Sequence, residues 1–208
     1  MQTITPDSNE THSLLEQVAA GRTDAMDALF ERHRGALHEA VRRRLDRRVQ
    51  PRVDPSDVVQ ETQAEAAARL PNYLQQRPMP FRLWLLKTAH ERMKKIERYH
   101  LEATKREVQR EVPLPADTSL QLAQGFIARG SGPAARRGRR DLVHKIRRML
   151  GSLSEIDREI VMLRNFEALS NEEVACLLEI RPETAKKRYA RALLRLQRMA
   201  IEQGLTEG

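Results

Sequence analysis

The sequence is poor in aromatic residues, glycine and cysteine, and these shortages exclude several kinds of structure. Aromatic residues make up 4% of the 208 residues and glycine contributes nine, whereas charged residues make up 32%. Such a composition, with abundant Ala, Leu, Arg and Glu, favours helices over sheets. The one cysteine, Cys176, excludes an internal disulfide and a cysteine-based zinc site. We predict an all-α protein.

Long apolar runs are also missing. No stretch approaches eighteen apolar residues, and the first residues lack the basic start and apolar run of a secretory signal. We therefore expect a cytoplasmic protein without membrane insertion. Lys and Arg outnumber Asp and Glu by 37 to 29, which gives a net charge of +8. This surplus indicates affinity for a polyanion, and charge alone does not choose between nucleic acid and an anionic membrane surface.

Helical spacing of apolar residues marks the first half of the chain. Residues 14–45 predict two helices, the second entered near Thr23. The arginines at 42–44 suit either the negative end of a helix dipole or a contact with DNA. Asp54 as cap and Pro55 at the first position then predict a helix that ends near Leu70, because Pro71 follows.

A further helix begins after Pro80. Its apolar stripe consists of Phe81, Trp84, Leu85, Ala89, Met93 and Ile96, and its other face is basic. Trp84 is expected to belong to the core because it lies on this stripe. Prolines and glycines then interrupt residues 113–138, which we interpret as a linker. We predict two small helical domains, at residues 10–112 and 139–208, and four helical segments in the second.

The second domain contains the strongest motif. Ser170 and Glu173 have the spacing of a capping box, which starts one short helix, and Pro182 is a natural first residue of another. The turn between them, at residues 179–181, gives helix-turn-helix spacing. Glu179 stands where such turns commonly have glycine, so we expect a left-handed backbone there at some cost.

Positive charge is concentrated on the second helix of this motif. Residues 181–198 contain seven Lys or Arg and one acid, Glu183, whereas a merely solvated face usually mixes its signs. We predict that this helix enters a DNA major groove, with the residues up to 188 reaching bases and those beyond meeting phosphate. The candidate DNA contacts are Arg181, Thr184, Lys186, Lys187, Arg188, Arg191 and Arg195.

Three segments carry a family resemblance. Residues 153–175 resemble the fourth conserved region of bacterial sigma factors, and on their own they also fit a response-regulator output domain. Residues 54–62 and 81–89 resemble two successive helices of the family's second region. These motifs occur in family order, and the chain lacks the middle domain of larger sigma factors. It is therefore similar to the extracytoplasmic-function (ECF) type of the sigma-70 family.

The resemblance implies a subunit that binds core RNA polymerase and directs it to promoter DNA. At matching positions, Asp57, Gln60 and Glu61 would face the coiled-coil clamp of the polymerase's largest subunit. The helix from Phe81 would melt the promoter and recognise its minus-ten element, and the helix from Pro182 would read the minus-thirty-five element. The candidate minus-ten contacts are His90, Glu91, Arg92, Lys94, Lys95 and Arg98. An anti-sigma factor or another regulator is a further expected partner.

Other classes of function fit less well. The chain has no Gly-rich phosphate loop, nucleophile elbow or metal-ligand constellation, so we expect neither an enzyme nor a cofactor. A stand-alone helix-turn-helix transcription regulator is the closest alternative, since it would share the basic helix but act without a polymerase-binding half. A basic scaffold for RNA or membrane explains the charge but not the ordered motifs.

Overall fold

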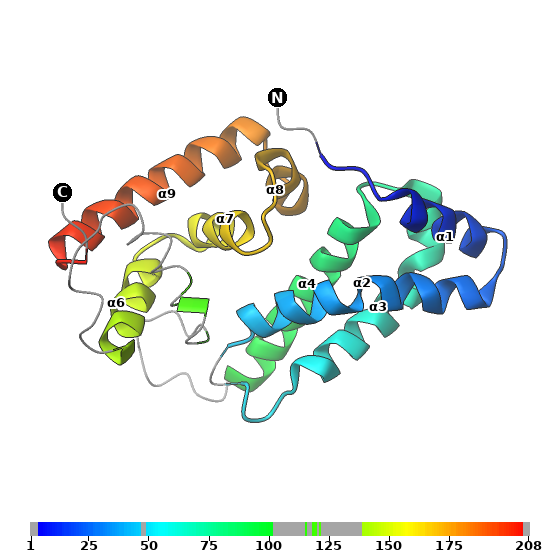
Figure 1. Cartoon of the computed structure of the whole chain (residues 1–208), viewed down its shortest axis with the longest axis horizontal. Helices are drawn as coiled ribbons and strands as arrows, with labels where there is room; N and C mark the ends of the chain where they lie inside the picture. The colour runs from blue at the N-terminus through cyan, green and yellow to red at the C-terminus, as the bar shows by residue number, and fades with distance from the viewer. Residues whose placement is uncertain are drawn as a thin grey trace. The chain divides into compact units, whose positions relative to one another are not determined.

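The computed structural model describes residues 4–46, 49–101, 115, 118–119, 121 and 139–205. Within these residues every regular element is a helix, which confirms the predicted all-α class (Figure 1). The helices are α1 (Asn9–Ala19), α2 (Thr23–Arg44), α3 (Pro55–Gln76), α4 (Phe81–Leu101), α6 (Arg139–Gly151), α7 (Glu155–Asn165), α8 (Asn171–Leu178) and α9 (Pro182–Glu202). They divide into two compact units, α1–α4 and α6–α9. Apart from four residues, the expected linker at 113–138 lies outside the described part.

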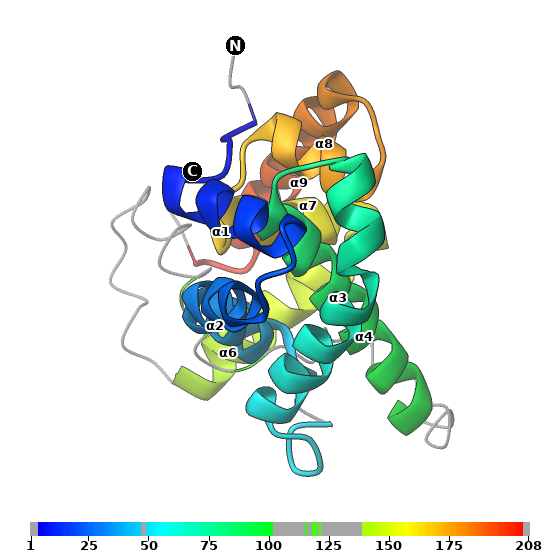
Figure 2. The same ribbon diagram turned by 90° about the vertical axis from the view of Figure 1, so that its right-hand side faces the viewer.

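The N-terminal unit is built around an aromatic cluster. α4 packs against both α2 and α3, and α1 lies against α2 (Figure 2). Phe81, which is fully buried, has its ring centroid 5.7 Å from that of Tyr73 and 5.6 Å from that of Trp84. Phe30 and His33 of α2 approach the same ring at 6.0 and 5.2 Å. Trp84 therefore belongs to the core, as its place on the apolar stripe led us to expect.

The polar segment before α1 contributes a cap that sequence reasoning missed. The backbone N–H of Phe81 donates to Asp7 Oδ2 at 2.8 Å, and that of Arg82 to Asp7 Oδ1 at 3.5 Å. The first N–H groups of a helix have no partner within the helix, and a carboxylate is favoured at this positive end of the helix dipole. Asp7 thus caps α4 from more than seventy residues away in the chain.

The predicted end of α3 at Leu70 is wrong. The helix contains Pro71 and continues to Gln76, where Arg77 closes it in a left-handed conformation. Proline removes one hydrogen bond from a helix interior. The next turn nevertheless stays helical because Tyr73 is buried against Phe81 and Trp84, and its hydroxyl donates to the carbonyl of Met79 at 3.0 Å. Tertiary packing here outweighs the local cost.

The C-terminal unit has its own core. Buried residues of α6, α7 and α9 form one cluster, and α9 runs along α7 and α8 (Figure 1). The four helices agree with the four segments that the sequence predicts after residue 138. Among the described residues of both units, no helix is long and apolar enough to span a membrane.

Candidate nucleic-acid interface

The first turns of α3 separate polar from apolar residues as the sequence predicts. Asp57, Gln60 and Glu61 are exposed. On the opposite side, Val58, Val59 and Thr62 are buried beneath them, at 0 to 1% exposure. The helix start is fixed by Asp54, whose carboxylate accepts the N–H of Ser56 at 2.7 Å. The three candidate polymerase contacts therefore lie on one accessible side of a well-anchored helix.

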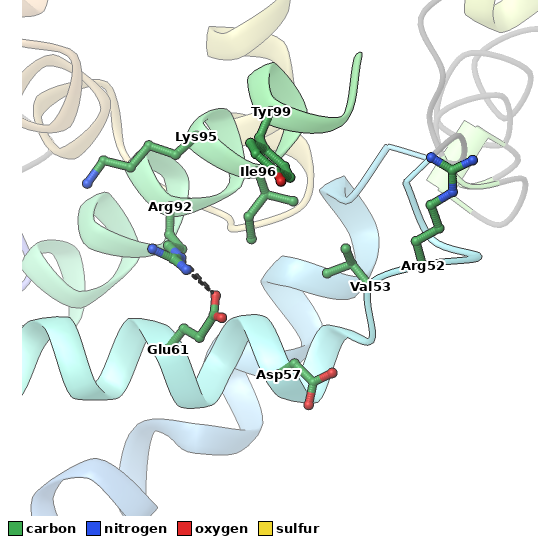
Figure 3. Close-up of a pocket in the computed structure, with 8 residues that line it drawn as sticks. All are labelled: Arg52, Val53, Asp57, Glu61, Arg92, Lys95, Ile96 and Tyr99. Atoms are coloured by element: carbon green, nitrogen blue, oxygen red, sulfur yellow. Dashed lines mark hydrogen bonds and ion pairs between the residues drawn. The ribbon is translucent and has the colours of Figure 1, made fainter. Parts of the chain in front are cut away.

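A pocket between α3 and α4 brings two of the candidate sites together. Figure 3 shows Arg92 of α4 pointing at Glu61 of α3, and its Nε and Nη2 donate to Glu61 Oε2 at 2.8 and 2.5 Å. Asp57 lines the same pocket but points away from this pair. The other lining residues are Arg52, Val53, Lys95, Ile96 and Tyr99. Glu61, which is expected to face polymerase, thus contacts Arg92, which is expected to face DNA.

The pair belongs to a row of charges along the two helices. Glu65 of α3 accepts from Lys95 of α4 at 3.3 Å and from Arg69 at 2.5 Å. Arg69 also donates to Glu91 of α4 at 3.1 Å. Sequence reasoning missed Glu65 and Arg69, because helical periodicity does not tell which residues of two helices lie opposite each other. The basic side of α4 is therefore interleaved with acids from α3.

His90, a candidate minus-ten contact, does not lie with the exposed basic residues of α4. Its exposed fraction is 6%, beside the buried residues Ala89 and Leu86. Leu83 and Leu86 are buried as well, and neither belongs to the core cluster that α4 shares with α2 and α3. Leu83, Leu86 and His90 form a second buried stripe at spacings of three and four. Lys94, Lys95 and Arg98 are exposed, and Glu91 and Arg92 are half-buried.

The helix-turn-helix has the local geometry that its sequence predicts. Ser170 Oγ accepts the N–H of Glu173 at 3.1 Å, and the Glu173 carboxylate accepts the N–H of Ser170 at 2.8 Å, which completes the capping box. Glu179 closes α8 with a φ of 56°, in the left-handed region. Arg181 then precedes Pro182 at the first position of α9.

The side chains of α9 sort into stripes. Ala185, Ala192, Leu196 and Ala200 are buried. Lys187, Arg191, Leu194 and Arg198, at spacings of four, three and four, are exposed and share the opposite side of the helix. Of the other candidate contacts, Arg181, Lys186 and Arg195 are exposed, whereas Thr184 and Arg188 are half-buried on the flank. The outermost stripe is thus rich in cations, as phosphate contact requires.

Arg188 is held within the unit. Its Nη1 donates to Asp157 Oδ1 in the first turn of α7 at 2.9 Å. Burial raises the pKa of the Asp157 carboxyl, but hydrogen bonds from Ser154 and Arg188 outweigh this effect and hold the pKa below its ordinary value. Sequence reasoning missed Asp157, although its place three residues after Ser154 resembles a capping motif and offered a signal.

Comparisons with known proteins cover both units. A family model described as Sigma-70, region 4 matches residues 144–196. RNA polymerase sigma factor CnrH of Cupriavidus metallidurans is 29% identical over 185 residues, which cover 88% of this chain and 90% of that protein. The solved structure of CnrH in complex with the cytosolic domain of CnrY matches with a TM-score of 0.58 and 24% identity, over 92% of this chain and 97% of that chain. The likeness therefore includes α1–α4 as well as the helix-turn-helix.

Proposed function

We propose that this chain, a sigma factor of the sigma-70 family and of the ECF type, binds core RNA polymerase and directs it to a specific set of promoters. The observation that carries the proposal is the similarity to CnrH along both units. A stand-alone regulator would share α9 but has no use for the exposed acidic and amide side chains at the start of α3. The sigma-factor function accounts for both α9 and these side chains of α3.

In this proposal the two units divide the work. Residues 10–112 form the domain that binds polymerase through Asp57, Gln60 and Glu61. Its helix α4 engages the minus-ten element through Arg92, Lys94, Lys95 and Arg98, with Glu91 at the edge of that surface. The exposed cations supply the contacts to a melted strand that single-stranded DNA binding needs. Residues 113–138 link this domain to the second.

Residues 139–208 form the domain that recognises the minus-thirty-five element. The major groove admits a helix and presents base edges that distinguish sequences, and α9 offers an exposed basic stripe of suitable length. Lys186 and Lys187, near the start of α9, are proposed to reach bases together with Arg181 and Thr184. Arg191 and Arg195, one and two turns further on, are proposed to contact phosphate.

The setting of the protein follows from the same proposal. A sigma factor acts in the cytoplasm and catalyses no reaction of its own. CnrH was solved bound to the cytosolic domain of CnrY. By analogy, we propose that a regulatory protein that covers the polymerase-binding or DNA-binding surface restrains this chain, in the manner of an anti-sigma factor.

Binding to core polymerase tests the proposal directly. The full chain is mixed with core enzyme purified from the source bacterium and separated by size-exclusion chromatography. We expect one complex with a single copy of the chain, and we expect core enzyme preloaded with another sigma factor to bind less of it. A folded chain that elutes apart from core enzyme would contradict the proposal and favour a stand-alone regulator.

A further inference from the structure

The contact between Arg188 and Asp157 joins two helices at fixed points. Asp157 Oδ1 accepts from Arg188 Nη1 at 2.9 Å, and Asp157 Oδ2 accepts from the hydroxyl of Ser154 at 2.6 Å. Ser154 is in turn the N-cap of α7. Both oxygens of the carboxylate are therefore engaged, and the side chains of Arg188 and Asp157 are only 38% and 25% exposed. In this structure the guanidinium of Arg188 is thus directed at α7.

The neighbouring residue of α9 is held by the other end of α7. The guanidinium of Arg164 lies over the ring of Tyr189, 5.2 Å from its centroid, and Arg164 also donates to the carbonyl of Leu169. Asp157 and Arg164 lie seven residues apart on α7, about 10 Å along a helix. Residues 188 and 189 of α9 are thus fixed at two separated points, which sets both the rotation and the direction of α9 relative to α7.

The exposed stripe of α9 lies beside these contacts, and its residues do not take part in them. Lys187 and Arg191 are exposed, and neither lies on the buried stripe of Ala185 and Ala192. Rotation of α9 about its axis would move this stripe relative to a groove while the cations themselves stayed unchanged. The ion pair at Arg188 is one of the contacts that hold α9 against this rotation, together with the buried stripe.

We propose that Arg188 and Asp157 are positioning residues that fix α9 on α7, and that base preference comes from the exposed residues around Lys187. This inference rests on the proposed function, that α9 reads promoter DNA. It departs from the sequence-based expectation that Arg188 itself reaches a base. The charge pair matters because of its geometry, so exchange of the two charges should restore the link between the helices, although not the hydrogen bond from Ser154.

Reversal of the pair tests this inference. The variants are Arg188→Asp, Asp157→Arg and the double variant with both changes, each assembled with core polymerase. A strong promoter is first selected with the wild-type holoenzyme. The affinity of each holoenzyme is then measured for this promoter and for single-base variants of its minus-thirty-five element. Each single reversal should weaken binding to all sequences by about tenfold or more, because it leaves a charge facing its like. The double variant should recover affinity to within about threefold of wild type.

A milder variant keeps the test informative if a reversal prevents folding. Arg188→Gln removes the charge but retains a hydrogen-bond donor, and its fold is checked by circular dichroism. We expect weaker binding with the ranking of upstream variants unchanged. Loss of preference at one base pair in Arg188→Gln would overturn the inference, since that is the behaviour of a base contact. A folded double variant as weak as Arg188→Asp alone would overturn it too.

Two further variants separate this inference from the function on which it rests. Lys187→Ala and Arg191→Ala lie on the exposed stripe and leave the ion pair in place. If both leave affinity, base preference and salt dependence unchanged, α9 is not the reader and the proposed function fails. If they change binding while the double reversal does not recover it, only the positioning role is wrong.

Discussion

Arg92 of α4 donates two hydrogen bonds to one carboxylate oxygen of Glu61 on α3, at 2.8 and 2.5 Å. The pair joins the surface proposed for polymerase to the surface proposed for the minus-ten element. Its side chains are 32% and 49% exposed, and such pairs contribute roughly 0.2–1 kcal/mol. A basic group of the polymerase can therefore displace Arg92 from Glu61 at small cost, which would leave Arg92 available to a DNA phosphate.

Polymerase binding should depend on the polar side of α3. Asp57→Ala combined with Gln60→Ala removes two proposed contacts without disturbing the Glu61–Arg92 pair. We expect the Kd for core polymerase to rise about tenfold, equivalent to about 1.4 kcal/mol, with helix content unchanged. Gln75→Ala, on an exposed position of the same helix, is the matched control. Equal affinity of the double variant and the control would remove these residues from the interface.

The cap supplied by Asp7 should stabilise the N-terminal unit. Asp7→Ala leaves the first N–H groups of α4 without their carboxylate partner, so we expect the free energy of unfolding to fall by about 0.5–2 kcal/mol. Urea unfolding followed by fluorescence of Trp84, the one tryptophan of the chain, reports on this unit. Asp27→Ala, an exposed position in α2, controls for the loss of a negative charge. A loss of stability no larger than that of the control would contradict the capping role.

Stability of the same unit should depend on pH through His33. Burial lowers the pKa of this imidazole below its ordinary value of 6.5; Asp7 opposes the shift, and Arg32 and Arg82 add to it. The unfolded chain then binds the proton more readily than the folded chain, so stability is full above pH 6.5 and falls as the pH drops below it.

Trp84 fluorescence at a series of pH values measures this dependence. We expect His33→Gln to flatten the slope of unfolding free energy between about pH 7 and pH 5, because glutamine does not titrate. His12→Gln, which removes an exposed histidine of α1, should leave the slope as in wild type. An identical slope in all three proteins would show that His33 does not control it.

Glycine should be more stable than alanine at position 168, where the backbone before α8 is left-handed. Ala168 is exposed and has a φ of 51°, which costs an alanine roughly 1–2 kcal/mol and a glycine almost nothing. Part of the gain is offset by the greater freedom of glycine in the unfolded chain, so Ala168→Gly should stabilise the C-terminal unit by about 0.5–1 kcal/mol. Native-state hydrogen exchange of α8 and α9 amides measures this change. Ala190→Gly, inside α9, should lower protection instead.

The sequence predicted local structure better than relationships between elements. The capping box at Ser170, the left-handed Glu179 and the start of α9 at Pro182 all follow from short-range chemistry, and the structure confirms them. The same local reasoning ended α3 too early, since the packing of Tyr73 in the aromatic cluster overrides Pro71.

Contacts between distant segments were beyond this reasoning. The cap on α4 comes from Asp7, and no periodicity connects the two. His90 became a candidate contact through its position after Ala89 in the family resemblance, and the burial of its side chain could not be read from that position. The partners of Arg92 and Arg188 depend on how α3 and α7 are aligned with their neighbours, and a sequence alone does not fix that alignment.

Promoter-specific transcription with purified components measures whether the chain acts as a sigma factor. Core polymerase of the source bacterium is incubated with genomic DNA fragments, with and without the full chain, and the transcript starts are mapped. We expect starts that appear only with the chain and share two sequence elements upstream. We also expect the Asp57→Ala and Gln60→Ala double variant to lower all of these starts together. A folded chain that binds core polymerase and DNA but creates no new start would contradict the claim that it is a sigma factor.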